Sequence, residues 1–308
     1  MNQNTDANEA VRTDSHIGFI GLGLMGHGAA KHLLKAGYKV EVLAHRKRQA
    51  IDDLLGLGAT EAASAAQLAE RADVVFLCLP DANTVDQTVL HTDGLLAGAH
   101  AGLLVVDMTT SLPDTTRRLA TRFAERQAEF IDAPLSRTPK EAQLGRLNIM
   151  VGGSSEQFAR VTPIISSFCE NIWHIGDLGL AHTFKLLNNS IVAANIATVL
   201  EAAVAADRLG IKHEVLMEIC SQGGAASAAM QMIMPYALNG DSSTFQAHTS
   251  TLVKDVRYYN QIADDAGGAG FMAKSALHLF QLAAAMGANQ TLVPELYDTL
   301  SALDGTQS

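Results

Sequence analysis

The chain has 308 residues, of which 48% are hydrophobic and 18% are charged. This length predicts about two domains, and this composition supports a sizeable core and excludes wholesale disorder. Lys and Arg number 22 against 32 Asp and Glu, which argues against a nucleic-acid-binding protein because such proteins need an excess of base. The cysteines, Cys78, Cys169 and Cys220, match no metal-ligand spacing, so we expect no metal site and a cytoplasmic location.

Two segments bear on export and membrane insertion. Residues 1–15 are polar and lack the basic start and apolar core of a signal peptide, so we predict a flexible tail. The Ala-rich stretch Ile191–Ala206 is interrupted by Asn195, Thr198 and Glu201. It is too short and too polar to span a bilayer, and it predicts a buried helix rather than a membrane anchor.

Short apolar runs alternate with helix-like segments in the first half of the chain. The runs typical of strands are His16–Gly21, Lys39–Ala44, Val74–Leu79, Leu103–Asp107 and Glu129–Asp132, and we expect further strands at Asn148–Val151 and Ile172–Ile175. Between the first two runs, residues 24–36 have helical spacing and end before Gly37. Strands that alternate with helices favour a parallel sheet covered on both faces.

The second half has a different character. From about Leu180 to Leu300 we find no convincing strand, and Ala, Leu and Met dominate. This pattern is typical of a helical domain. We therefore predict an α/β domain over residues 16–178, followed by an all-α domain over residues 179–308.

A glycine-rich motif follows the first predicted strand and opens the first predicted helix. The motif is G-x-G-x-x-G and consists of Gly21, Leu22, Gly23, Leu24, Met25 and Gly26. Gly21 allows a tight turn, Gly23 lets the backbone approach a pyrophosphate, and Gly26 allows close helix–strand packing. The helix N-terminus adds N–H groups and a partial positive charge. The motif in this context predicts a dinucleotide-binding Rossmann domain, and the alternative is a tight turn with no ligand.

The end of the second predicted strand indicates which dinucleotide is bound. An NAD-specific site usually has an acidic residue about 20 residues after the glycine motif. The strand instead runs into His45, Arg46, Lys47 and Arg48, with no carboxylate. Adjacent bases suit the additional phosphate of NADP. We predict that NADP(H) is preferred and NAD(H) is accepted, and the alternative is a solvated basic turn.

Several sequence blocks together resemble a known family. They are GFIGLGLMGHGAAKHLLKAG at 18–37, DMTTSLP at 107–113, DAPLSRTPKEAQLGRLNIMVGG at 132–153 and GLAHTFKLLNNS at 179–190, supported by FQAHTSTLVKD at 245–255. In their order and spacing they resemble the β-hydroxyacid dehydrogenase family, which includes 3-hydroxyisobutyrate dehydrogenases and tartronate semialdehyde reductases. The resemblance implies a Rossmann domain, a helical domain that closes over the substrate, and a long helix that contributes to dimerisation. The long Ala-rich helices themselves predict a homodimer or homotetramer, because their apolar faces need cover.

The resemblance also implies a catalytic group. Hydride transfer to a carbonyl leaves an alkoxide that must receive a proton. Lys185, in the pattern Lys185-Leu-Leu-Asn188-Asn189, matches the catalytic lysine of the family. Asn189 lies four residues later on the same helix face, where it is expected to position the lysine or the substrate, with Asn188 in support. The alternative for Lys185 is a helix lysine whose stem covers apolar surface.

Other positions match residues that the family places near the cofactor. Thr110 matches a residue near the nicotinamide ribose, Leu79-Pro80 ends a strand at the cofactor edge, and Lys254 of the Lys254-Asp255 pair is expected near the nicotinamide. The alternatives are a helix cap, a strand end and a surface charge pair. His248 is either a residue of the substrate pocket or a structural polar residue.

The substrate loop departs from the common family pattern Asp-Ala-Pro-Val-Ser-Gly-Gly. Here Ser136 is followed by Arg137 and Thr138 in place of the two glycines. A guanidinium at this point predicts a clamp for a carboxylate or sulfonate. Arg-Thr in this loop resembles a branch that includes sulfolactaldehyde and succinic semialdehyde reductases, and some dehydrogenases of 3-hydroxy amino acids are similar as well. In the alternative, Arg137 turns outward or pairs with an acid such as Glu141.

These features predict an NAD(P)-dependent oxidoreductase. It is expected to interconvert a small anionic 3-hydroxy acid, or a related ω-hydroxy acid, with its semialdehyde or ketone, and Lys185 is the general acid/base. One alternative is a dehydrogenase of a 3-hydroxy amino acid of the serine or phenylserine type. Another is a non-catalytic dinucleotide-binding regulatory protein, against which the presence of Lys185 argues.

Overall fold

The computed structural model describes residues 14–43 and 48–303. All but the last two residues of the predicted tail lie outside these ranges. The basic turn formed by His45, Arg46 and Lys47 lies outside them as well.

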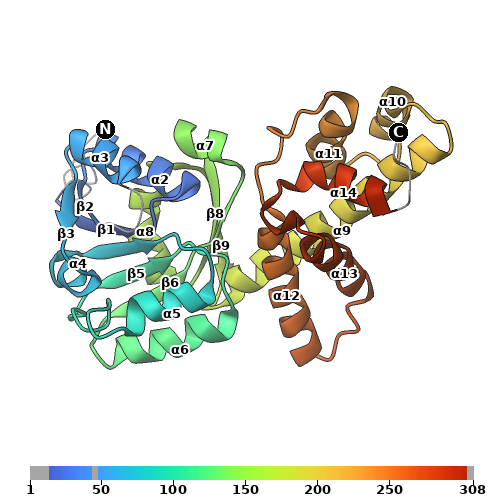
Figure 1. Cartoon of the computed structure of the whole chain (residues 1–308). Coiled ribbons are helices and arrows are strands. Elements are labelled where there is room, and N and C mark those ends of the chain that lie inside the picture. Colours follow the sequence, from blue (N-terminus) through green and yellow to red (C-terminus); the bar gives the residue numbers. More distant parts are fainter. Residues whose placement is uncertain (1–13, 44–47, 304–308) are drawn as a thin grey trace, which may run out of the picture. The chain divides into compact units, whose positions relative to one another are not determined.

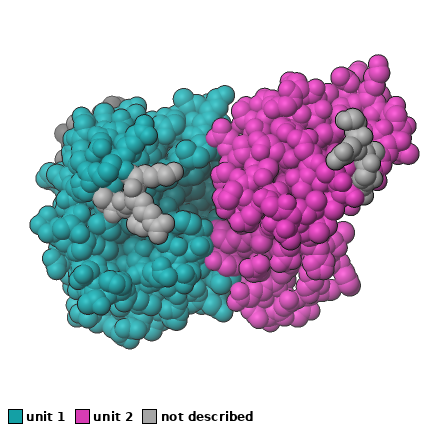
Figure 2. All heavy atoms as spheres, in the orientation of Figure 1, with its two compact units in different colours: residues 1–185 teal, residues 186–308 magenta. Residues whose placement is uncertain are grey.

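The chain forms two compact units, residues 1–185 and residues 186–308, which Figure 2 colours separately. The division falls inside the long helix α9 (Leu180–Arg208). The predicted domain boundary at residue 178 lies just before the start of this helix. Lys185 therefore belongs to the first unit, whereas Asn188 and Asn189 belong to the second.

Six parallel strands form the main part of the sheet in the first unit. They are β1 (His16–Ile20), β2 (Lys39–Leu43), β3 (Thr60–Ala62), β4 (Val74–Leu77), β5 (Leu104–Asp107) and β6 (Glu129–Asp132). Their order is β3-β2-β1-β4-β5-β6, which is the Rossmann arrangement. In this arrangement a dinucleotide binds beyond the carboxyl ends of the strands, where the strand order reverses between β1 and β4.

Helices cover both faces of this sheet, as alternate side chains of β4 illustrate. Val74 and Phe76 belong to one apolar core, whereas Val75 and Leu77 belong to another, because successive side chains of a strand point to opposite faces. The first core is covered by α2 (Leu24–Lys35), α3 (Gln49–Gly56), α7 (Pro139–Leu144) and α8 (Ser155–Ile165), and the second by α4 (Ala65–Arg71), α5 (Ala82–Leu90) and α6 (Pro113–Ala124) (Figure 1).

The sheet continues beyond β6 with strands of a different arrangement. These are β7 (Leu135–Ser136), β8 (Leu147–Gly152) and β9 (Cys169–Gly176). β8 is antiparallel to both β6 and β7, and β9 is parallel to β8. The expected parallel sheet is therefore parallel only over its first six strands. The chain returns from β7 to β8 through the short helix α7, and such a return joins antiparallel neighbours.

The second unit is helical over its described residues. After α9 come α10 (His213–Ser221), α11 (Ala228–Asn239), α12 (Thr249–Asp265), α13 (Phe271–Ala285), the 3₁₀ helices η1 (Ala288–Gln290) and η2 (Val293–Glu295), and α14 (Leu296–Leu303). Pairing of β type in the described part of this unit is limited to one isolated bridge between His248 and Leu292. The core includes Ile196 and Leu200 of α9 and Phe280 of α13.

Helix α9 is longer than the apolar stretch that predicted it. It has 29 residues, and its most apolar window has a mean hydropathy of 1.4, so by length and composition it could cross a membrane, alone among the helices of the described residues. The argument that the segment is too short therefore does not hold. Half of that window is nevertheless buried inside the protein, with Ile196 and Ala203 in the core of the second unit. This burial is typical of a core helix.

Candidate active site

The glycine motif forms the connection between β1 and α2. Gly21 has φ +100, a conformation that L side chains rarely adopt. A Cβ at Gly21 would lie 2.2 Å from the carbonyl oxygen of Cys78, which follows β4. A Cβ at Gly26 would lie 2.0 Å from the Gly21 oxygen. The two glycines are thus required by the close approach of β1, β4 and α2.

Gly23 differs because no atom of the protein lies within 4 Å of a Cβ built on it. It is the N-cap residue of α2, it makes no side-chain cap, and the first turn of α2 contains no acidic residue. The first N–H groups of a helix have no partner within the helix. They suit the pyrophosphate of a dinucleotide. Residues 21–26, which we call the glycine cradle, therefore fit the predicted cofactor. Within the motif, Leu22 and Met25 pack against the core, whereas Leu24 is exposed.

The ends of β4 and β5 are joined by a side chain to which the sequence assigned no role. Thr109 is buried, and its hydroxyl accepts a hydrogen bond of 3.0 Å from the Leu79 N–H. The Thr109 N–H in turn donates to Asp107 Oδ1 over 2.9 Å. The predicted residue Thr110 is half-buried beside it, and Pro80 is exposed. Thr109 therefore holds together the two backbone segments on which the predicted cofactor residues Leu79 and Thr110 lie.

Asp132 fixes the start of α9. It ends β6 and is fully buried, and its two carboxylate oxygens accept the N–H groups of Gly179 and His182, each over 2.8 Å. Gly179 precedes the first residue of α9 and has no side chain with which to cap it. Asp132 therefore satisfies the N–H groups that a capping side chain satisfies in other helices. The helix that carries Lys185 is attached in this way to the carboxyl end of the sheet.

The His182 ring makes a second set of contacts at this point. It is fully buried, its Nε2 donates to the Thr109 carbonyl over 2.8 Å, and its Nδ1 lies 2.7 Å from Thr116 Oγ1. Burial raises the pKa of the nearby Asp107 carboxyl, and the charge of His182 partly opposes this rise. Lys185 follows His182 by three residues, nearly one turn of the helix, and is half-buried. The segment that positions Thr110 and the helix that positions Lys185 thus share one buried hydrogen-bond network.

The substrate loop contains an unusual backbone conformation. Arg137 has φ +82, although glycine is the residue that ordinarily adopts this conformation. Its neighbour Thr138 caps α7, because the Thr138 hydroxyl accepts the Lys140 N–H over 3.3 Å and the Thr138 N–H donates to Glu141 over 3.1 Å; the hydroxyl also donates to Glu141. The hydroxyl of Thr138 holds the pKa of Glu141 below its usual value. Ser136 is half-buried at the end of β7.

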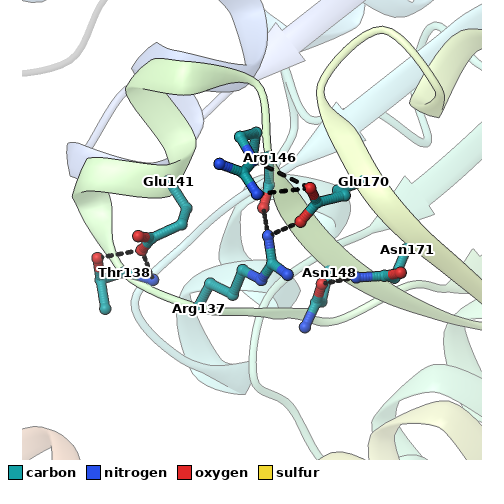
Figure 3. Close-up of polar contacts among 7 residues, drawn as sticks. All are labelled: Arg137, Thr138, Glu141, Arg146, Asn148, Glu170 and Asn171. Atoms are coloured by element: carbon teal, nitrogen blue, oxygen red, sulfur yellow. Dashed lines mark hydrogen bonds and ion pairs between the residues drawn. The ribbon is translucent and has the colours of Figure 1, made fainter.

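Figure 3 shows the Arg137 side chain directed toward Glu170, the second residue of β9. Arg137 Nη1 donates to Glu170 Oε2 and, over 2.6 Å, to the carbonyl oxygen of Arg146. Arg146 Nε and Nη2 donate to Glu170 Oε1 over 3.0 and 2.7 Å. Arg137 therefore pairs with an acid in this structure. That acid is Glu170 rather than Glu141, which is occupied by Thr138.

The predicted asparagines and Lys254 come together in the second unit. Asn188 Nδ2 donates to Asn189 Oδ1 over 3.1 Å, and Asn189 Nδ2 donates to Asp255 Oδ2 over 2.7 Å. The other oxygen of Asp255 lies 3.0 Å from Lys254 Nζ. Lys254 Nζ also lies 5.6 Å from the centre of the Tyr258 ring. Asp255 is buried, so it joins α9 to α12 through a carboxylate shared by Asn189 and Lys254.

Two further positions have structural contacts. His248 is exposed at the N-terminus of α12, and its Nδ1 lies 2.8 Å from the Gln290 carbonyl oxygen. Arg48, next to the basic turn that lies outside the described residues, donates to Glu61 over 2.7 Å and to Asp52 over 3.1 Å. Within the ranges that the structure describes, no group of three or more His, Cys, Asp or Glu is arranged to hold a metal ion.

Four residues make contacts that connect the predicted site residues, although the sequence assigned them no role: Thr109, Asp132, His182 and Glu170. Each contacts a partner that is far away along the chain. Asp132 and His182, for example, are 50 residues apart. A local signal existed only for His182, which lies on the helix of Lys185. The remaining residues resemble ordinary residues at strand ends.

The strand order, the glycine cradle and the helical second unit define a dinucleotide-binding oxidoreductase. Two family profiles agree with this class. The NAD binding domain of 6-phosphogluconate dehydrogenase matches residues 16–176, and the NAD-binding domain of NADP-dependent 3-hydroxyisobutyrate dehydrogenase matches residues 179–296. The chain belongs to the β-hydroxyacid dehydrogenase family.

Two relatives illustrate the range of this family. The chain is 35% identical over 227 residues to a 2-(hydroxymethyl)glutarate dehydrogenase of Eubacterium barkeri, covering 73% of this chain and 75% of the relative. It is 31% identical over 293 residues to an NAD-dependent L-serine dehydrogenase of Pseudomonas aeruginosa, covering 92% of this chain and 97% of the relative.

Solved structures share the fold over nearly the whole chain. A 3-hydroxyisobutyrate dehydrogenase from Salmonella typhimurium is 27% identical, with a TM-score of 0.83 over 93% of this chain and 100% of that chain. Psf3 in complex with NADP+ and 2-OPP is 28% identical, with a TM-score of 0.81 over 92% of this chain and 100% of that chain. The predicted family, fold class and enzymatic nature are confirmed. The chain is an NAD(P)-dependent oxidoreductase of the hydroxy-acid type, and the non-catalytic alternative is set aside.

Proposed function

We propose that the enzyme interconverts a small anionic 3-hydroxy acid, or a related ω-hydroxy acid, and its semialdehyde or ketone, with NADP(H) as the preferred cofactor. The observation that carries this proposal is the anchored start of α9. Asp132 and His182 hold this helix against the carboxyl end of the sheet, and Lys185 follows within a turn. The lysine therefore comes from a rigid part of the same unit that contains the glycine cradle.

Each residue has a defined part in this proposal. The bound nicotinamide supplies or accepts the hydride. Lys185 Nζ donates a proton to the carbonyl oxygen during reduction and accepts it back during oxidation. An asparagine amide has two hydrogens on Nδ2, and Asp255 receives one of those of Asn189. The other is directed to the substrate oxygen, and Asn188 keeps the Asn189 amide in this orientation.

The substrate loop supplies the anion-binding groups. We assign the substrate carboxylate or sulfonate to the Ser136 hydroxyl, the Thr138 segment and the Arg137 guanidinium. A planar guanidinium can bind two oxygens of such a group at once. This assignment makes the substrate an acid rather than a neutral alcohol, and it requires Arg137 to exchange its present partner for the substrate.

The cofactor groups are assigned in the same way. The N–H groups at the start of α2 bind the pyrophosphate, Leu79, Pro80 and Thr110 line the nicotinamide half, and Lys254 lies near the nicotinamide. His45, Arg46 and Lys47 bind the additional phosphate of NADP. We also infer a cytoplasmic homodimer or homotetramer, since exposed apolar residues of the second unit, such as Ile191 and Ile219, favour a covered surface.

Initial rates with NADPH and with NADH test the proposal. Succinic semialdehyde, sulfolactaldehyde, methylmalonate semialdehyde and glyoxylate serve as substrates. We expect turnover of at least one of these acids, faster with NADPH, and a loss of about 100-fold or more in kcat for Lys185→Ala. The control is the NADPH affinity of Lys185→Ala, which should match that of the wild type. Full turnover by Lys185→Ala would contradict the mechanism.

A second candidate is oxidation of a 3-hydroxy amino acid, which the similarity to the L-serine dehydrogenase favours. The amino group of such a substrate needs an acceptor. Oxidation of L-serine or phenylserine with NADP or NAD, without turnover of any semialdehyde, would select this function instead.

A further inference from the structure

Glu170 holds two arginines through different oxygens. Arg137 binds Oε2, whereas Arg146 binds Oε1 through two nitrogens (Figure 3). Arg137 lies in the substrate loop, and Arg146 immediately precedes β8. The loop guanidinium that is assigned to the substrate anion is thus already bound to a carboxylate of the protein.

We propose that Glu170 is a specificity-determining positioning residue that competes with the anionic group of the substrate for Arg137. This inference rests on the proposed function. A neutral substrate has no group with which to displace a carboxylate, so it gains nothing from Arg137. An acid substrate offers the same chemical group as Glu170 and takes its place. The Arg137–Glu170 pair therefore lowers the affinity for acids and leaves the affinity for neutral aldehydes unchanged, so Glu170 limits how strongly the enzyme prefers acids.

Because the two arginines bind different oxygens of Glu170, the release of Arg137 costs little free energy. When Arg137 leaves, Glu170 keeps both hydrogen bonds from Arg146, so no carboxylate is left without a partner. Exposed fractions of 28% for the Arg137 side chain and 35% for Glu170 also keep water in contact with the pair. Ion pairs of this exposure alter a binding equilibrium by about 1.4- to five-fold, which a substrate anion can overcome.

The charge of Glu170 is maintained at neutral pH. The guanidinium of Arg137, followed by that of Arg146, holds the pKa of Glu170 below its usual value. The competitor is therefore a carboxylate whenever the substrate is one. Protonation of Glu170 plays no part in the exchange at neutral pH.

The strands beneath the pair do not depend on it. Asn148 and Asn171 are register partners on β8 and β9, and the Asn171 amide donates to Asn148 Oδ1 over 2.9 Å. Glu170 itself has no register partner, because the pairing shifts by one residue between Leu147 and Asn148, but both of its neighbours, Cys169 and Asn171, are paired with β8. The variant Glu170→Gln, which keeps the shape and removes the charge, is expected to fold like the wild type.

Two variants are expected to act in opposite directions. Glu170→Gln weakens the competitor, so the affinity for an acid rises about two- to five-fold. Arg146→Gln leaves the Glu170 charge to Arg137 alone, so the affinity for an acid falls about two-fold. Arg137→Gln removes the clamp and lowers the affinity about tenfold or more. Glu170→Asp, which retains the charge, should restore values near those of the wild type.

The test is binding of succinate to the NADP-loaded enzyme by isothermal titration calorimetry, together with KM and kcat for succinic semialdehyde and for its methyl ester. Support is a tighter succinate complex and a lower KM for the acid in Glu170→Gln, with kcat and the KM for the ester unchanged. Weaker binding of succinate in Glu170→Gln would overturn the proposal, because Glu170 would then hold the loop in its binding conformation. Unchanged binding, or no succinate binding by any variant, would overturn it as well. If the wild type does not turn over succinic semialdehyde, by contrast, that result contradicts only the proposed function, because the binding of succinate is measured independently of turnover.

Discussion

The glycine motif provides a matched pair of substitutions whose effects should separate stability from cofactor binding. Gly21→Ala places a Cβ 2.2 Å from the Cys78 carbonyl oxygen, and that oxygen belongs to backbone held by the Cys78 N–H bond to Ile20. The φ of +100 adds about 1–2 kcal/mol for an L residue, and overpacking adds about 1–3 kcal/mol. The free energy of unfolding should fall by about 3.5 kcal/mol, near the middle of the summed range.

Thermal unfolding followed by circular dichroism measures this loss. For a unit of this size about 3.5 kcal/mol lowers Tm by about 7–14 °C. The control is Gly23→Ala, where φ is −73 and no protein atom lies within 4 Å of the added carbon. We expect its Tm to stay within about 2 °C while its NADPH affinity, from fluorescence titration, falls about tenfold or more. Equal Tm losses in the two variants would refute the reasoning.

Three further predictions concern the contacts around the site. Asp132→Asn replaces one of the two acceptors for the Gly179 and His182 N–H groups. The free energy of unfolding in urea should fall by about 2–4 kcal/mol, and kcat should fall with it. A change below about 0.5 kcal/mol would contradict the capping role of Asp132. Thr109→Val leaves the Leu79 N–H without its acceptor, so the KM for NADPH should rise. Thr109→Ser keeps the hydroxyl and should keep the wild-type KM. Equal KM values in the two variants would contradict this prediction. The hydrogen bond to Asp298, together with burial, raises the pKa of Tyr236 to about 12, so the folded protein retains this proton above the ordinary pKa of 10. Stability should therefore fall as the pH rises from about 10 to 12. Tyr236→Phe should flatten this fall in melts followed by circular dichroism, and an unchanged pH profile would exclude the contribution.

The sequence predicted the elements whose signals are local. The apolar runs at His16–Gly21 and Val74–Leu79 became β1 and β4 within a few residues, and the glycine motif fell between a strand and a helix as its spacing requires. The helical second half was equally clear, because Ala- and Leu-rich segments of that length have few other stable forms in water.

Contacts between distant residues were not predictable in the same way. The sequence pointed to Thr110, whereas the hydroxyl that joins β4 and β5 belongs to Thr109, and adjacent threonines differ only in the direction that the backbone gives them. Arg137 was recognised as a residue that needs an anion, but Glu170 lies 33 residues later, and Glu141 was the nearer acid. β7 is only two residues long, which is too short for any periodic signal.

The attachment of α9 to Asp132 has a consequence for insertions and deletions. The start of the helix is held by an acceptor on β6, in addition to the Asp177 carbonyl oxygen that accepts the Leu180 N–H. Segments between residues 132 and 179 could therefore lengthen or shorten at their surface turns while Lys185 kept its height above the sheet. This arrangement separates the placement of the reactive amine from the shape of the loop that chooses the substrate, so new specificities can be built without rebuilding the chemistry.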